Sequence, residues 1–324
     1  MDKKVISGYI KNITAIMVVY AIVFYLIQIK VINNYQNGIL ILAGIYIIVA
    51  ASLNLATGYL GQLALGHAGF MAIGAYTAAL FAIAVELPKY VELVAGLILG
   101  GVMAGIFGLI IGIPALRLRG DYLGIVTLGF GEIIRIALLN LSFTGGAAGL
   151  KGIPRYVNFT EIYFLVVLVI AFLFAFIRSR HGRAILSIKE DEIAAESVGI
   201  PTTFYKVYGF VVSAFIAGVG GGALGFYQRI LDPKKFNFMF SVEFFIIVVL
   251  GGMGSITGTV IAALALAFIN EFLYSIDELR LVFYALTLII LMIFKSDGLL
   301  GRKEFSLIKL LNRFSKKTKI ENAD

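Results

Sequence analysis

Charged residues are scarce in this chain, and their scarcity indicates a membrane protein. Of its 324 residues 14% are charged and 60% are hydrophobic, and the mean hydropathy is +0.97. Ordinary soluble domains carry about 25% charged residues. Residues 31–85 contain no Asp, Glu, Lys or Arg. A helix of that length would measure about 80 Å, more than twice the thickness of a bilayer core, so this run must fold back within the membrane.

Cysteine is absent, and histidine occurs only as His67 and His181. Without cysteine there is no basis for a disulfide framework, a thiolate metal site or a cysteine nucleophile. The two histidines lie far apart in sequence, which argues against a zinc site. The sequence also lacks HExxH, P-loop and GxSxG patterns, so any ATP that drives the protein must be bound by another chain. We expect no catalytic residue, metal or cofactor here.

The positive charge lies in short flanks beside apolar segments. The net charge is +8, but its distribution fits the positive-inside rule and not nucleic-acid binding. We therefore place both termini in the cytoplasm. The first segment lacks a small-residue cleavage site and is predicted to be a retained helix. The cytoplasmic basic residues are Lys3, Lys4, Lys11, Arg117, Arg119, Arg178, Arg180, Arg183, Lys189, Arg302, Lys303, Lys309, Arg313, Lys316, Lys317 and Lys319.

Hydropathy predicts an all-α polytopic membrane protein. The apolar segments lie near residues 12–29, 38–56, 62–85, 92–116, 122–141, 161–177, 204–228, 242–269 and 279–294. Nine full spans would place the basic tail outside. The segment 242–269 contains GGMGSITG, and we expect it to be two half-helices, Val242 to Leu250 and Thr259 to Ile269. We favour about eight spans plus this re-entrant or broken element; ten spans is the alternative.

Glycine-rich breaks occur at 54–69 and 251–258. Paired broken segments in two halves of a chain point to a central substrate site in transporters. Gln62 and His67 lie in the first break, beside Ala64, Ala68 and Ala72 at intervals of four residues. One interpretation is that the small residues serve close packing alone, with His67 hydrogen-bonded at a helix interface. The other interpretation is that Gln62 and His67 line a pathway.

Glu132 and Arg135 lie three residues apart in the fifth segment, so a helix places them on one face. Ionisable residues within spans are often functional, which makes both candidates for the pathway. An oppositely charged pair also neutralises itself, which favours a structural role. An unpaired acid suited to a proton relay is not evident, since Glu243 lies at the edge of its segment.

The loop 178–203 is the most informative soluble segment. It holds a helix-like run from Ala184 to Val198, closed by the stop signals Gly199 and Pro201. Apolar residues alternate there with charged ones, so a short amphipathic helix that docks a soluble partner is expected. A solvated or membrane-surface connector is the alternative.

Five ordered motifs resemble the permease subunits of ABC importers for branched-chain amino acids, of the LivM type. The likeness covers about Leu53 to Ile293. The motifs are LNLATGYLGQLALGHAGFMAIGAY at 53–76, GDYLGIVTLGFGEIIRI at 120–136, TGGAAGLKGIP at 144–154, HGRAILSIKEDEIAAESVGI at 181–200 and VVLGGMGSITGTVIAA at 248–263.

The resemblance implies an ABC importer permease fold, with residues 1–300 as the transmembrane permease domain and 301–324 as a basic cytoplasmic tail. It implies a second, LivH-like permease, two cytoplasmic ATP-binding subunits, an extracytoplasmic solute-binding protein and membrane lipid as partners, in a bacterial inner membrane. The loop 178–203 resembles the EAA coupling loop of importers, although the usual Ile-x-Leu-Pro part is missing after Gly199. The residues implied in coupling are Arg183, Glu190, Asp191, Glu192, Ala195, Glu196 and Gly199.

The function implied by the resemblance is uptake of Leu, Ile or Val by alternating access, driven by ATP hydrolysed on the partner chains. A permease for urea or short amides of the same family is a close alternative. An ion-coupled secondary transporter that works alone is a more distant one. An intramembrane enzyme would need a clustered set of acids, histidines or nucleophiles, and the sequence shows none.

Overall fold

The computed structural model describes residues 3–116, 118, 120–272 and scattered positions between 282 and 304. These residues are helical apart from connecting segments and one isolated β-bridge between Leu150 and Leu231. The main helices are α1 (Lys3–Gln28), α2 (Asn34–Asn54), α3 (His67–Ala84), α4 (Lys89–Ala115), α5 (Asp121–Asn140), α6 (Phe159–Arg178), α7 (Arg180–Glu190), α8 (Glu192–Ser197), α9 (Thr202–Gln228), α10 (Phe238–Gly251) and α11 (Ile256–Phe272).

The chain divides into two compact units. One contains residues 1–38 with 303–324 and includes α1; the other contains residues 39–302 and holds the elements from most of α2 onward. All of the candidate site residues belong to the second unit, which the following paragraphs describe.

Six helical stretches of the described residues are long and apolar enough to cross a membrane. They are Asn34–Tyr59, His67–Ala84, Lys89–Ala115, Tyr122–Asn140, Phe159–Arg178 and Thr202–Gln228. Each corresponds to a predicted segment. The described part of the first segment, Asn12–Gln28, is a shorter apolar helix. The predicted segment 279–294 lies outside the described residues, except for isolated positions, as do Arg117, Arg119 and most of the tail 301–324.

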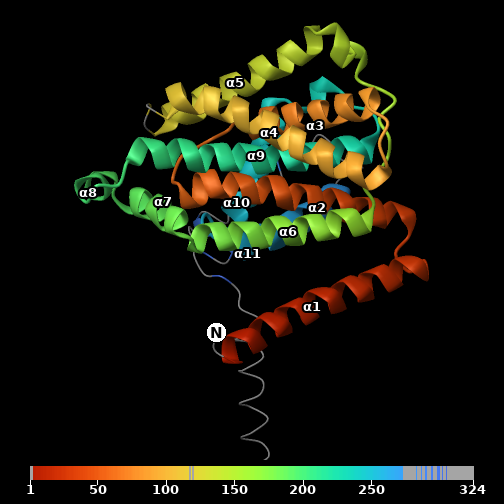
Figure 1. Ribbon diagram of the computed structural model, residues 1–324, viewed down its shortest axis with the longest axis horizontal. Coiled ribbons are helices and arrows are strands. Elements are labelled where there is room, and N and C mark those ends of the chain that lie inside the picture. Colours follow the sequence, from red (N-terminus) through yellow and green to blue (C-terminus); the bar gives the residue numbers. More distant parts are fainter. Residues whose placement is uncertain are drawn as a thin grey trace, which may run out of the picture. The chain divides into compact units, whose positions relative to one another are not determined.

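The helices α3, α4 and α9 pack on one another through glycine (Figure 1). A Cβ added at Gly74 of α3 would lie 2.1 Å from the carbonyl oxygen of Gly218 in α9. One added at Gly100 of α4 would lie 2.6 Å from the carbonyl oxygen of Gly74. Small residues let the backbones of membrane helices approach this closely, which maximises van der Waals contact where water supplies no hydrophobic driving force.

The helices differ in how much of their surface the chain itself covers. Most of α2 and α9 is buried within the chain, whereas only 28% of the α5 span and 22% of the α6 span are buried. The exposed side chains of α5 and α6 are largely apolar, as Ile125, Ile133 and Leu168 illustrate. Apolar surface of this kind is stable against lipid or another membrane subunit, so α5 and α6 lie at the periphery of this unit.

The predicted break in 242–269 is confirmed. Helix α10 ends at Gly251, residues 252–255 are not helical, and α11 begins at Ile256. Helix α10 has 14 residues, and at ~1.5 Å per residue it is shorter than the ~30 Å core of a bilayer. A Cβ at Gly251 would lie 2.5 Å from the carbonyl carbon of Gly258, so the two halves touch next to the break.

Candidate functional site

The first glycine-rich break is also confirmed. After α2 the chain forms a π-helical turn at Leu55–Tyr59 and is then irregular as far as Gly66. Single π-helical turns are rare and are frequent at functional sites. The apolar segment near 62–85 becomes helical at His67, the first residue of α3. The Leu65 N–H donates instead to the hydroxyl of Thr127 in α5, at 3.0 Å.

Asn54, at the end of α2, joins the two breaks. Its amide nitrogen donates to the Ser255 carbonyl at 2.9 Å and to the Thr259 hydroxyl at 2.7 Å. Its amide oxygen accepts from the Gly254 N–H at 2.8 Å. The side chain is fully buried, so these bonds satisfy a polar group that would otherwise be costly within a membrane protein. Two segments about two hundred residues apart are thereby held in contact.

The contact between the breaks requires glycine on both sides. A Cβ at Gly58 would lie 1.8 Å from the Asn54 amide oxygen and 2.4 Å from the Gly254 nitrogen. Gly254 has φ +96°, a conformation that other residues rarely adopt. We call this contact of residues 54–59 with residues 252–255 the break crossing.

The loop 178–203, the predicted coupling loop, forms two helices where the sequence predicted a single run from 184 to 198. The run is interrupted at Asp191, whose carboxylate accepts from the Ile193 and Ala194 N–H groups at 2.9 and 3.0 Å. This cap starts α8, because an N-cap carboxylate satisfies backbone donors that a continuous helix would have used.

The predicted stop at Gly199 is confirmed, and it is a Schellman motif. The Gly199 N–H bonds to the Glu196 carbonyl at 2.9 Å and the Ile200 N–H to the Ala195 carbonyl at 3.1 Å. Gly199 has φ +84°. Ala195 is buried, whereas Glu196 is exposed together with Ile193 and Val198.

Two lysines attach the coupling loop to the transmembrane helices. Lys189, in the last turn of α7, donates from Nζ to the carbonyl oxygen of Gly58 in the break crossing. Lys206 of α9 is largely buried and forms an ion pair with Glu192 of α8, with Nζ 2.6 Å from Oε1. Arg183 is exposed and donates to the Arg178 carbonyl at 2.8 Å, and Glu190 is exposed.

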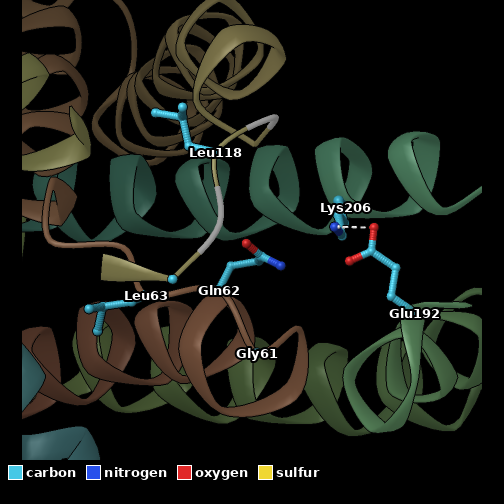
Figure 2. A pocket seen from close by; sticks show the side chains of 7 residues that line it. Gly61, Gln62, Leu63, Leu118, Glu192 and Lys206 are labelled. Atoms are coloured by element: carbon cyan, nitrogen blue, oxygen red, sulfur yellow. Dashed lines mark ion pairs between the residues drawn. The ribbon is translucent and has the colours of Figure 1, made fainter. Parts of the chain in front are cut away.

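A pocket of about 300 Å³ lies between the first break and the coupling loop. It is lined by Gly61, Gln62, Leu63, Leu118, Gly120, Glu192 and Lys206. Figure 2 shows the Gln62 amide pointing toward the Lys206–Glu192 pair, with the two leucines on the other side. The structure thus brings a pathway candidate, Gln62, beside a coupling candidate, Glu192. Whether Gln62 lines a pathway stays a prediction.

His67 is fully buried and holds three helices together. Its Nε2 lies 2.8 Å from the Ser213 hydroxyl of α9, which donates to the Ser52 carbonyl of α2 at 2.6 Å. Since that hydroxyl gives its hydrogen to Ser52, the histidine must carry its own on Nε2. The packing interpretation accounts for these contacts, and the pathway role of His67 stays a prediction.

Glu132 and Arg135 form the expected pair, with Arg135 Nε 2.7 Å from Glu132 Oε2. The second oxygen of Glu132 accepts from the N–H of Phe238 at 2.8 Å, at the start of α10. A carboxylate is favoured there by the unpaired N–H groups of the helix N-terminus. The pair therefore fixes α5 to α10, and its role in a pathway stays a prediction.

Three residues of this site were missed by sequence reasoning as candidates: Asn54, Lys189 and Lys206. Two of them could have been singled out from the sequence. Asn54 is an amide within the uncharged run 31–85, and Lys206 is the sole charged residue of the predicted segment 204–228. Lys189 stood among other charged residues of the loop, and nothing in the sequence separated it from them.

The similarity to known proteins covers both breaks and the loop 178–203. The model of a family described as "Branched-chain amino acid transport system / permease component" matches residues 35–293. The permease protein LivM of Salmonella typhimurium is 36% identical over 291 residues, which cover 79% of this chain and 68% of that protein. The chain belongs to this family.

Other relatives of this permease family extend the likeness. The permease protein LivH of Escherichia coli K12 is 34% identical over 147 residues, 44% of this chain and 47% of that protein. A probable LivM of Methanocaldococcus jannaschii is 24% identical over 82% of this chain and 93% of its own length. No solved structure matches significantly. With its apolar helices, this family member is an integral membrane protein.

Proposed function

We propose that this chain is a LivM-type permease subunit of an ATP-driven ABC importer that takes up branched-chain amino acids. The observation that carries the proposal is the 36% identity to LivM over 79% of the chain. That relative is a high-affinity branched-chain amino acid transport system permease protein. The chain acts as a transport subunit, and ATP is hydrolysed on separate partner chains.

The proposed complex contains a second, LivH-like permease, two ATP-binding subunits and an extracytoplasmic solute-binding protein in a bacterial inner membrane. The identity to LivH over 147 residues supports a related permease as the partner. The basic flanks of the apolar segments support cytoplasmic termini and a cytoplasmic coupling loop.

The exposed surface of α8 supports docking of the ATP-binding subunits. Ile193 and Val198 are 78% and 75% exposed, and Glu196 lies between them in sequence. Apolar side chains beside a charged group on a short soluble helix suit a protein partner. In this mechanism ATP binding closes the two ATP-binding subunits, which pulls the helices of residues 184–199 together and tilts the spans around a central path. The ligand then moves inward, as alternating access requires.

Reconstitution of the complex tests the proposal. The chain is purified with its partner permease, its ATP-binding subunits and its binding protein, and uptake of labelled leucine, isoleucine, valine and urea into liposomes is measured. We expect ATP-dependent uptake of the amino acids. Uptake of urea alone would favour the urea and amide permeases. Ion-driven uptake by this chain without an ATP-binding subunit would refute the importer proposal.

Substitutions in α8 should separate ATP hydrolysis from uptake. Glu196→Ala removes an exposed charge, and Gly199→Ala strains only the backbone, since nothing lies within 4 Å of an added Cβ. We expect both complexes to assemble, because a residue forced to positive φ costs only about 1–2 kcal/mol. Uptake per ATP hydrolysed should fall several-fold in both.

The matched control is Glu86→Ala, which removes an exposed acid from the connection after α3, away from the coupling loop. It should leave the ratio of uptake to hydrolysis unchanged. An unchanged ratio in both α8 variants would remove α8 from the coupling mechanism.

A further inference from the structure

We propose that Lys189 is the positioning residue that transmits movement of the coupling loop to the break crossing. The inference rests on the proposed function, because it assumes that partner subunits move this loop. Lys189 is not catalytic and is not expected to touch substrate. Its role would be to move the break crossing together with α7 when α7 is displaced.

The Lys189 side chain bonds to the first broken segment and lies beside the second. The Lys189 ammonium donates to the Gly58 carbonyl in the first break. It also lies 3.7 Å from where a Cβ would stand at Gly254, in the second break. The aliphatic stem covers Gly61, where an added Cβ would lie 3.1 Å from Lys189 Cγ. The glycines therefore leave the space through which this lysine reaches the crossing.

The chemistry of the contact suits the transmission of force. A hydrogen bond from an ammonium is roughly twice as strong as one between neutral groups. Its acceptor, the Gly58 carbonyl, belongs to a π-helical turn whose backbone is next to the Asn54 bonds. Displacement of α7 would thus pull on the break crossing. The neighbouring pair of Glu192 and Lys206 has a different effect, because it fixes α8 to α9, a helix within the packed core.

A purely structural role makes a different prediction. If Lys189 only held α7 in place, its loss would loosen the coupling loop without changing how the crossing responds to nucleotide. A reporter at the crossing separates the two roles. This chain contains no cysteine, so a single introduced cysteine is the one thiol of this subunit that maleimide can label.

The experiment uses the whole complex with Met253→Cys as the reporter, since Met253 lies in the second break and is 45% exposed. Maleimide labelling is timed with and without a non-hydrolysable ATP analogue. Ile230→Cys, exposed in the segment after α9, serves as a reporter away from the crossing. We expect nucleotide to change the labelling rate at 253 and not at 230.

Lys189→Met should abolish the response of residue 253 to nucleotide and lower uptake about tenfold, the size expected for one lost hydrogen bond to a charged group. The rate of ATP hydrolysis by the Lys189→Met complex should change by less than about twofold. Lys189→Arg, which keeps the cation, should retain most of the response. Arg180→Met removes an exposed cation from the same helix and should change neither readout.

A nucleotide response that survives Lys189→Met, or one that Arg180→Met abolishes equally, overturns the inference. The inference also fails if the reporter does not respond in the unsubstituted complex. If the complex with Lys189→Met does not assemble, the same labelling and uptake measurements are made on Lys189→Gln, which keeps a neutral donor on a shorter stem. The same outcomes then support or overturn the inference. A wrong substrate assignment would give a different result. The complex would then hydrolyse ATP, and the label at residue 253 would respond to nucleotide, but no branched-chain amino acid would be imported.

Discussion

Asn54→Ala should abolish uptake and lower the thermal stability of the complex. The substitution removes the three hydrogen bonds that the Asn54 side chain makes with Gly254, Ser255 and Thr259, and leaves the Gly254 N–H without this acceptor. An orphaned buried donor costs about 1–3 kcal/mol, and the cavity left by the amide adds to this. We expect a total on the order of 3 kcal/mol, measured as a lower unfolding temperature of the purified complex in detergent, together with loss of leucine uptake.

Asn140→Ala is the matched control for this prediction. Asn140 is exposed, and its amide donates to the Ile136 carbonyl one turn earlier, at 2.7 Å. Its replacement should change the unfolding temperature little and leave uptake intact. If Asn54→Ala also preserves both, the break crossing is held by packing alone, and its amide bonds have no role in stability or transport.

Gly221→Ala should prevent the protein from accumulating in a folded form. The added Cβ would lie 1.9 Å from the Met71 carbonyl oxygen, so α3 and α9 would have to separate. Overpacking of this kind typically costs about 1–3 kcal/mol and sometimes more, and here the neighbour is rigid backbone. We expect little or no monodisperse protein after extraction, measured by size-exclusion chromatography at matched expression.

Two other glycines provide the controls. An added Cβ at Gly105 of α4 would meet its nearest neighbour at 3.7 Å, an ordinary contact, and one at Gly129 of α5 would meet nothing within 4 Å. Because alanine favours helix over glycine by about 1 kcal/mol, Gly129→Ala should be neutral or mildly stabilising. Normal accumulation of Gly221→Ala would show that α3 and α9 can repack, and that their close approach is not required.

The helical spans could be predicted because their signal is local. Apolar segments of sufficient length identified the six stretches now seen to be long enough to cross a membrane. Both breaks were also predictable, since glycine-rich sequence within apolar surroundings disfavours regular helix. The exact start of α3 at His67 could not be predicted, because the irregular segment before it is held by a hydroxyl of α5, a long-range contact.

The functional contacts were harder to predict because they join distant parts of the chain. Glu132 and Arg135 are three residues apart, and helical spacing alone predicted their pairing. Lys189 bonds to Gly58 across 131 positions, and no periodicity connects them. The interruption of the loop at Asp191 escaped prediction since an acid within a charged run resembles any other solvent-exposed residue.

The bonds of Asn54 have a consequence for biosynthesis. Its partners lie about 200 positions later in the chain, at Gly254, Ser255 and Thr259. At a synthesis rate of about 5–20 residues per second, α2 waits roughly 10–40 s in the membrane before those partners emerge. During this interval the amide lacks its final partners. A chain released before residue 254 therefore carries this amide without those partners, at the cost of an unpaired buried polar group.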